Sequence, residues 1–272
     1  MNATGNNDTA TQQSIGATAP LCVWQTEAIL GEGILWCPQL KSLLWTDIIG
    51  CRLYSYSPYS GAKNTWTLPE PLTCIVPCTT GDYLAVFTSG LYLCSLYSGV
   101  DNRLIRNKKL SAIEAELPSN RPNDGGCDYW GNLWFGTMDK DESRASGSFY
   151  RYNRATGFNR YRQRVTISNG PVIAPPKSYR YRSVNRSDKC LIYYTDTLQR
   201  TIYQATIRAN GQQCDARPFC CFSSDDGYPD GMAIDEEYHL WCCLWGSGSI
   251  VRISPAGKIV QRIQLPVSHV TK

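Results

Sequence analysis

The amino-acid sequence predicts an all-β protein of the β-propeller class, and repeated segments carry this prediction. Aromatic-rich runs that read as strands recur at Leu44–Asp47, Leu133–Thr137, Ile192–Asp196 and Leu240–Trp245, with a weaker copy at Tyr83–Phe87. Roughly 40 to 60 residues separate successive runs, which is the length of one four-stranded propeller blade. The repeats therefore predict five blade-like units.

A polar corner precedes four of the five aromatic runs. The four corners contain Glu32 (Leu30-Gly-Glu-Gly33), Asn123 (Arg121-Pro-Asn-Asp-Gly125), Asn169 (Ser168-Asn-Gly170) and Asp230 (Tyr228-Pro-Asp-Gly231). In a propeller, the innermost strand of every blade starts at the same end of the central channel. Side chains that are far apart in the sequence are therefore expected to meet in one small volume.

Composition agrees with a single β domain. The chain has 272 residues with 8 Trp and 17 Tyr, and aromatic side chains suit the broad faces of stacked sheets. We expect a disordered tail over residues 1–20 and a propeller domain over residues 21–272. The tail lacks the basic start and apolar run of a secretory signal, and no stretch of about 18 apolar residues follows, so we expect a cytoplasmic protein without a membrane partner.

Two other features are given a structural interpretation. Arg alternates with Tyr in Tyr150–Arg154, Arg160–Arg164 and Tyr179–Arg182, a pattern that suits either a nucleic-acid surface or an outer strand with charge in water. We favour the outer strand and expect no nucleic-acid partner. The 13 cysteines include adjacent pairs within expected strands, which favours buried thiols over a disulfide framework.

Three of the corner residues form a candidate metal site. Glu32, Asn169 and Asp230 offer two carboxylates and one amide oxygen, the ligand type of hard divalent cations. The alternative is that the glycine-flanked Asn and Asp are only turn formers. Glu32 favours the metal site, because glutamate is not a typical turn former.

The ordered motifs resemble those of the gluconolactonase/regucalcin (senescence marker protein) family, six-bladed propellers that hydrolyse sugar lactones with one divalent metal. The matching segments are Leu30–Trp36, Leu44–Ile48, Arg121–Gly125, Leu133–Met138, Ser168–Gly170, Ile192–Asp196, Tyr228–Met232, Gly257–Val260 and Leu265–Val267. The resemblance implies a six-bladed propeller of four-stranded antiparallel blades. It also implies that most of the last blade is missing, so that an incomplete ring is expected.

Two segments depart from the family pattern. Only Leu21–Ala28 is available as an outer strand of the sixth blade. Residues 174–189 are longer than the short turn expected within the fourth blade, and we interpret them as a surface insertion or an altered segment.

The resemblance implies a role for each residue of the site. Glu32, Asn169 and Asp230 would hold one divalent metal ion (Ca²⁺, Mg²⁺, Mn²⁺ or Zn²⁺), and Asp230 would also take a proton from the attacking water. Arg121 and Asn123 would bind the substrate.

An acidic residue after the Gly-Thr-Met segment is also expected to contact the substrate. Asp139, Asp141 and Glu142 are the acids in that place, and Asp141 is the candidate chosen among them. Asp124 would orient Arg121, support the metal ligands or serve only the turn.

The resulting hypothesis is metal-dependent hydrolysis of a sugar (aldono-) lactone to the aldonic acid, with a small-molecule lactone as partner. The alternative is a non-catalytic propeller that binds Ca²⁺ or another protein and has lost activity with its last blade. A Ser-His-Asp hydrolase is disfavoured, since the chain lacks a Gly-x-Ser-x-Gly elbow and its two histidines, His239 and His269, lie in expected surface positions.

Overall fold

The computed structural model describes residues 20–99, 101–176 and 189–272. The expected tail, apart from Pro20, and most of the expected insertion at 174–189 lie outside the described residues, as does Tyr179–Arg182. Within the described residues, no helix is long and apolar enough to cross a membrane.

The described residues form five sheets, each with four antiparallel strands in sequential order. The first sheet contains β1 (Gly31–Cys37), β2 (Ser42–Asp47), β3 (Arg52–Tyr56) and β4 (Lys63–Thr67). The second contains β5 (Leu72–Pro77), β6 (Tyr83–Phe87), β7 (Gly90–Tyr97) and β8 (Arg103–Ser111). The third contains β9 (Asn120–Cys127), β10 (Leu133–Asp139), β11 (Gly147–Asn153) and β12 (Gly157–Val165).

The fourth sheet contains β13 (Ser168–Ala174), β14 (Lys189–Asp196), β15 (Thr201–Arg208) and β16 (Gln213–Cys221). The fifth contains β17 (Tyr228–Ile234), β18 (Leu240–Trp245), β19 (Ser249–Ile253) and β20 (Ile259–Gln264). Two short 3-10 helices, η1 (Thr197–Gln199) and η2 (Ser224–Asp226), lie in connections. The propeller class and the four-stranded antiparallel blades are thereby confirmed.

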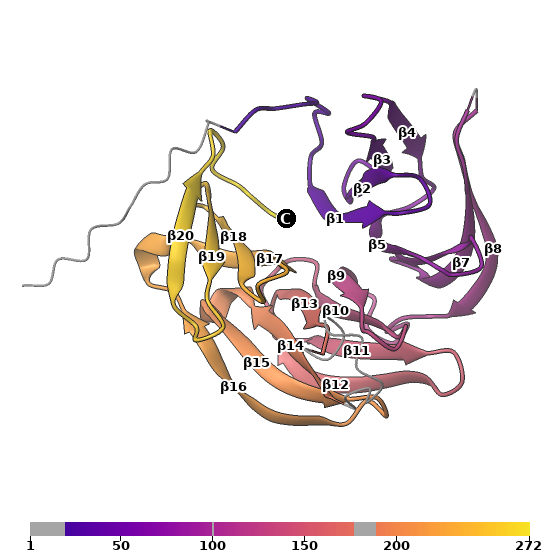
Figure 1. The fold of residues 1–272 in the computed structure, drawn as a ribbon. Helices are drawn as coiled ribbons and strands as arrows, with labels where there is room; N and C mark the ends of the chain where they lie inside the picture. The colour runs from indigo at the N-terminus through magenta and orange to yellow at the C-terminus, as the bar shows by residue number, and fades with distance from the viewer. Residues whose placement is uncertain (1–19, 100, 177–188) are drawn as a thin grey trace, which may run out of the picture.

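The expectation of six blades is not confirmed, because the described residues form five. Figure 1 shows the blades as an incomplete ring, with β1–β4 and β17–β20 at its two ends and β1, β5, β9, β13 and β17 nearest the centre. The prediction of an outer strand at Leu21–Ala28 is wrong, since this segment forms no strand. Its Trp24 instead packs edge-on against Trp45 and Tyr54 of the first blade, with ring centroids 5.4 and 5.5 Å apart. Aromatic packing on the blade face thus replaces backbone pairing at a sheet edge.

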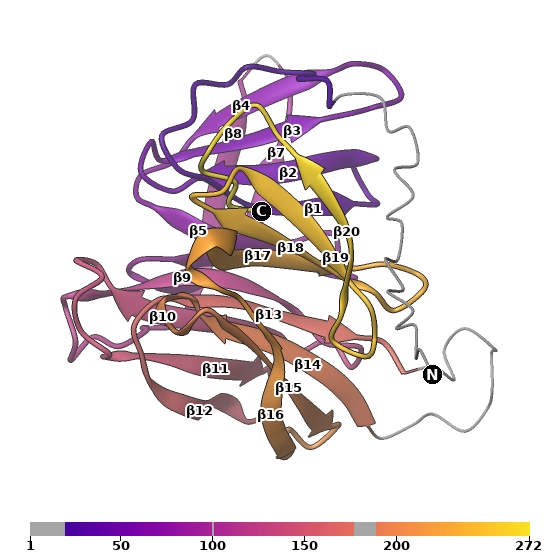
Figure 2. The same ribbon diagram turned by 90° about the vertical axis from the view of Figure 1, so that its left-hand side faces the viewer.

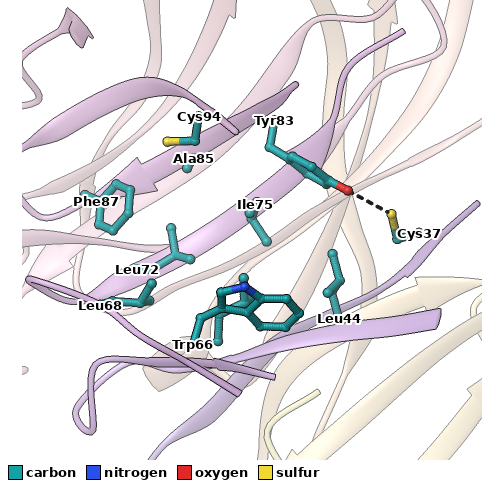
Figure 3. Packing of buried hydrophobic residues seen from close by; sticks show 11 residues of the cluster. Cys37, Leu44, Trp66, Leu68, Leu72, Ile75, Tyr83, Ala85, Phe87 and Cys94 are labelled. Atoms are coloured by element: carbon teal, nitrogen blue, oxygen red, sulfur yellow. Dashed lines mark hydrogen bonds between the residues drawn. The ribbon is translucent and has the colours of Figure 1, made fainter. Parts of the chain in front are cut away.

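Apolar cores lie between neighbouring blades. Four buried clusters occur in the described residues, one for each junction from the first blade to the fifth. Figure 3 shows the cluster between the first two blades, where the fully buried Trp66 packs among side chains of both sheets. A side view in Figure 2 shows the neighbouring sheets stacked face to face. Burial of these faces is the main force that arranges the blades around a centre.

A bulge interrupts the innermost strand of each blade near its start. Register shifts occur after Glu32 in β1, after Asn169 in β13 and after Pro229 in β17, with similar irregularities in β5 and opposite β10 in the third blade. Gly33 supports the first bulge, because its φ of 64° favours glycine and an added Cβ would lie 3.0 Å from the Thr73 carbonyl oxygen. Bulges re-aim side chains locally, which explains why the polar corners face the channel.

Residues after β20 return to the centre of the ring between the two end blades (Figure 1). The backbone N–H groups of Gly246 and Gly248 both donate to the Ser268 carbonyl at 3.0 Å, and the N–H of Gly231 donates to the Thr271 carbonyl at 2.7 Å. On the other side, the Thr271 hydroxyl donates to the Gly31 carbonyl of β1. The segment 268–272 therefore joins the fifth blade to the first across the gap in the ring.

Candidate active site

The polar corners open into a cleft of about 390 Å³ at one end of the central channel. Its polar lining includes Glu32, Arg121, Asn123, Asn169, Thr197 and Asp230. Its apolar lining includes Ile49, Met138, Ile167, Leu198, Tyr228 and Trp245. Five of the six predicted site residues thus share one cleft, and they come from four different blades.

Two aspartates of the aromatic runs position the loops that lead into the site. Asp47 accepts hydrogen bonds from the backbone N–H groups of Ile29 and Leu30, at 3.1 and 3.0 Å. In the fourth blade, Asp196 accepts equivalent bonds from residues 166 and 167, both at 3.2 Å. These carboxylates hold the backbone just before β1 and β13, and so place Glu32 and Asn169 at the channel.

A chain of hydrogen bonds connects the third, fourth and fifth blades beneath the cleft. The Arg121 guanidinium donates to Asn123 Oδ1 at 2.6 Å, and Asn123 Nδ2 donates to Asn169 Oδ1 at 3.1 Å. Asn169 Nδ2 donates to the Thr197 hydroxyl at 2.9 Å, and that hydroxyl donates to the Pro229 carbonyl at 2.9 Å. Every member has a partner, so the two amide side chains are held in single orientations.

The carboxylates of the site are buried and crowded. Glu32 and Asp230 are each 7% exposed, and Asp124 is 2% exposed. Burial and the nearby Asp124 charge raise the pKa of Glu32 to about 8. Burial and the nearby Glu32 charge raise the pKa of Asp230 well above its ordinary value. Three acids in a water-poor volume favour the uptake of positive charge.

Unpartnered oxygens show where a cation would fit. Glu32 Oε2 and Asp230 Oδ1 are buried and have no hydrogen-bond partner. Leaving such atoms unpaired is costly, and a bound cation removes that cost. Within the described residues, no group of three or more His, Cys, Asp or Glu side chains is arranged to hold a metal ion. The candidate set has only two carboxylates because its third member, Asn169, is an amide, and these oxygen donors fit a hard divalent cation.

Asp124 bonds to its own turn and also to two other parts of the chain. Its Oδ2 accepts a hydrogen bond from the Gly170 N–H at 2.9 Å, and its Oδ1 accepts one from the Gly125 N–H at 2.7 Å. Oδ1 also forms an ion pair with the Lys272 ammonium. Asp124 thus connects the bulges of the third and fourth blades to the segment 268–272.

The acidic loop after β10 differs from its expected arrangement. Asp141 is exposed and is not part of the cleft lining, whereas the adjacent Glu142 is. Asp139 accepts hydrogen bonds from Arg144 Nη2 at 2.7 Å and from the Ser143 hydroxyl. These bonds, of which the one from Arg144 has the largest effect, keep the pKa of Asp139 well below its usual range. Asp139 also accepts the backbone N–H groups of Ser143 and Arg144, both at 3.1 Å, and so holds the loop that carries Glu142.

Several residues of the site carry no clear signal in the sequence. Thr197 directly follows Asp196, the last residue of the Ile192–Asp196 run. This position is the one feature of the sequence that could have indicated a role in the site. Thr271 lines the cleft and Lys272 contacts Asp124, but nothing in the local sequence marks them, because their contacts are made with residues of distant blades.

A family model described as the SMP-30/Gluconolactonase/LRE-like region matches residues 30–272. The chain belongs to this family. The resemblance predicted from the motifs is therefore confirmed. Within the family, L-arabinolactonase of Azospirillum brasilense is 32% identical over 248 residues, which cover 90% of this chain and 76% of that protein.

Two further members of the family extend the comparison. The 6-deoxy-6-sulfogluconolactonase of Pseudomonas putida is 28% identical, over 90% of this chain and 78% of its own length. A solved structure of regucalcin from Agrobacterium tumefaciens, described as a calcium-binding protein, superposes with a TM-score of 0.79 at 25% identity, over 92% of this chain and 79% of that one.

Proposed function

We propose that this protein is a divalent-metal-dependent lactonase that hydrolyses a sugar lactone to the open-chain aldonic acid. The observation that carries the proposal is the pair of buried, unpartnered oxygens on Glu32 and Asp230, beside an oriented amide in a cleft of substrate size. Relatives of the same family that are named for sugar lactones support the substrate class.

Glu32, Asn169 and Asp230 would hold the cation. When bound, a divalent ion would polarise the lactone carbonyl and lower the pKa of a water. Asn169 is suited to this role because its Nδ2 donates to Thr197, which fixes the amide orientation. Within the described residues its Oδ1 accepts only one hydrogen bond, from Asn123, so that a second lone pair is available to a cation. The three side chains come from three blades, so the ring itself sets their spacing.

Asp230 is the proposed proton acceptor. Its carboxylate takes one proton from water as the water oxygen attacks the carbonyl carbon, and it returns that proton to the ring oxygen when the carbon–oxygen bond of the lactone breaks. Burial, and then the nearby Glu32 charge, raise the pKa of Asp230 above its ordinary value, which favours proton uptake by this carboxylate.

The remaining polar lining would bind and orient the substrate hydroxyls. Arg121 and Asn123 hold each other in place, and the guanidinium keeps further donors for hydroxyl or carbonyl oxygens. Glu142 lines the cleft, so in place of Asp141 it would accept a hydrogen bond from a substrate hydroxyl. Tyr228 and Trp245 provide flat apolar surface on which a sugar ring can lie.

The test is acid release from aldonolactones in a weakly buffered dye assay. Chelator-stripped protein is given Ca²⁺, Mg²⁺, Mn²⁺ or Zn²⁺ and compared with Asp230→Asn, Asn169→Ala and the exposed control Asp141→Asn. We expect turnover that depends on metal, falls at least about a hundredfold in the first two variants and is retained in the control. A folded protein that binds metal but gives only the spontaneous rate would favour the non-catalytic binding propeller.

A further inference from the structure

Lys272 lies at the carboxylate cluster although it belongs to none of the strands. Its side chain is 13% exposed, and its ammonium is paired with Asp124, whose side chain is 1% exposed. The chain reaches this point because Gly231 has no side chain: an added Cβ there would lie 2.5 Å from the Lys272 Cβ and 2.5 Å from the Thr271 oxygen. The fold thus delivers a positive charge into the channel by a close, defined contact.

The segment that carries Lys272 is held at several points along its length. Backbone bonds from Gly246 and Gly248 hold Ser268, and His269 stacks on Trp245 with ring centroids 4.3 Å apart and planes 5° apart. Thr271 then bonds to both end blades. These contacts hold the segment, and with it the Lys272 ammonium, in one position.

The ammonium acts on the proposed metal ligands as well as on Asp124. Burial is the main cause of the raised pKa values of Glu32 and Asp230, and the Lys272 charge counteracts it in both. The Arg121 guanidinium acts on Glu32 in the same direction as the Lys272 ammonium. A divalent cation would therefore enter a site that already contains positive charge.

Lys272 nevertheless leaves the proposed ligand oxygens free. Its ammonium bonds to Asp124, while Glu32 Oε2 and Asp230 Oδ1 keep no partner. The ammonium and a divalent ion would then lie next to each other in a volume of low dielectric, where like charges repel strongly. Lys272 therefore opposes a divalent ion through its charge and not by occupying the ligand oxygens.

We propose that the Lys272 ammonium is a tethered competitor of the divalent cation, and that it weakens binding of the metal at Glu32, Asn169 and Asp230. This inference rests on the metal site of the proposed function. Because coupling between two sites is reciprocal, bound metal also weakens the contact between Lys272 and Asp124. The segment 268–272 thereby links the occupancy of the site to the connection between the two end blades.

The first test measures metal binding itself, by titration calorimetry of chelator-treated full chain with CaCl₂ and with MnCl₂. Lys272→Met keeps most of the side-chain length without the charge, and Lys272→Arg keeps the charge. We expect Lys272→Met to bind at least about tenfold more tightly than the wild type, and Lys272→Arg to bind like the wild type. Thr271→Val, which loses the bond to Gly31, is expected to bind more tightly as well.

The second test uses the unmodified chain and needs no variant to fold. Acetylation by acetic anhydride is followed by peptide mass spectrometry with and without saturating Ca²⁺. We expect Lys272 to react faster when Ca²⁺ is bound, while the exposed Lys258 reacts at an unchanged rate.

The outcomes separate the inference from the proposed function. If the wild type binds Ca²⁺ or Mn²⁺ but Lys272→Met binds no more tightly and Lys272 reactivity is unchanged, the competitor is refuted and the metal site stands. If neither the wild type nor any variant binds either ion, both the metal site and its competitor are refuted.

Discussion

Replacing Glu32 by glutamine should stabilise the metal-free protein while abolishing its response to metal. Glu32 is buried, has one unpartnered oxygen and shares its surroundings with Asp124 and Asp230. Its pKa rises from 4.5 to about 8, chiefly through burial. A raised acid pKa means that the folded state binds the proton more tightly than the unfolded state, so stability is greatest at low pH and falls as pH rises from the unfolded pKa toward the folded one.

The size of the effect follows from this shift. At about pH 7.5 the linkage cost of Glu32 is about 4 kcal/mol, at roughly 1.4 kcal/mol per pH unit above 4.5. The buried amide of the variant keeps an imperfectly paired polar group, which costs about 1–3 kcal/mol. The net gain should be about 1–3 kcal/mol, or roughly 3–10 °C in Tm for a chain of this size.

Thermal melting in the presence of chelator, at about pH 7.5 and about pH 5, measures this prediction. Glu32→Gln should melt above the wild type at the higher pH, and the difference should shrink or reverse at the lower pH, because the unfolded state then also binds the Glu32 proton in part and most of the linkage cost is gone. Added Ca²⁺ should raise the Tm of the wild type and not that of the variant. The exposed Glu116→Gln serves as the matched control. A lower Tm for Glu32→Gln at pH 7.5, or a difference that does not change with pH, would refute the reasoning.

Three further predictions concern the supporting structure. Trp66→Phe loses the bond from the indole N–H to the Tyr97 carbonyl, 2.7 Å long, and should lower the free energy of unfolding by about 1–3 kcal/mol in urea titrations. Thr197→Val removes the hydroxyl that bonds Pro229, so kcat/KM for the lactone should fall about tenfold or more, and Thr197→Ser should restore it; equal rates would exclude a positioning role. Asp139→Asn should destabilise the protein at neutral pH, with the loss shrinking below about pH 4, since the depressed pKa of Asp139 adds stability only above its unfolded value; urea midpoints across pH test this.

The sequence alone predicted the class of fold and the family correctly. Each blade packs against its neighbours and therefore needs apolar and aromatic strands. These strands recur once per blade, so the local sequence shows them as a repeat. The polar corners were predictable for the same reason, since each has the same position within its own repeat. Five of the six predicted site residues share one cleft, and their roles stay predictions.

The structure differs from the sequence-based expectations at two places where contacts between distant residues determine the conformation. The segment Leu21–Ala28 was expected to form an outer strand, but it forms none, and its Trp24 packs on Trp45 and Tyr54 of the first blade. Glu142 and not Asp141 lines the cleft, which depends on the fold of the loop after β10 and not on one-dimensional spacing.

By itself, the sequence determined the blades, their order and which polar residues would face the channel, because these properties repeat with the local strand pattern. Only the tertiary structure decided that the segment 268–272 reaches the same place. Lys272 lies about 150 residues from Asp124 in the chain, and their ion pair exists because the segment 268–272 crosses between the end blades against a glycine. Contacts of this kind depend on how the blades are arranged around the centre, which no local pattern encodes.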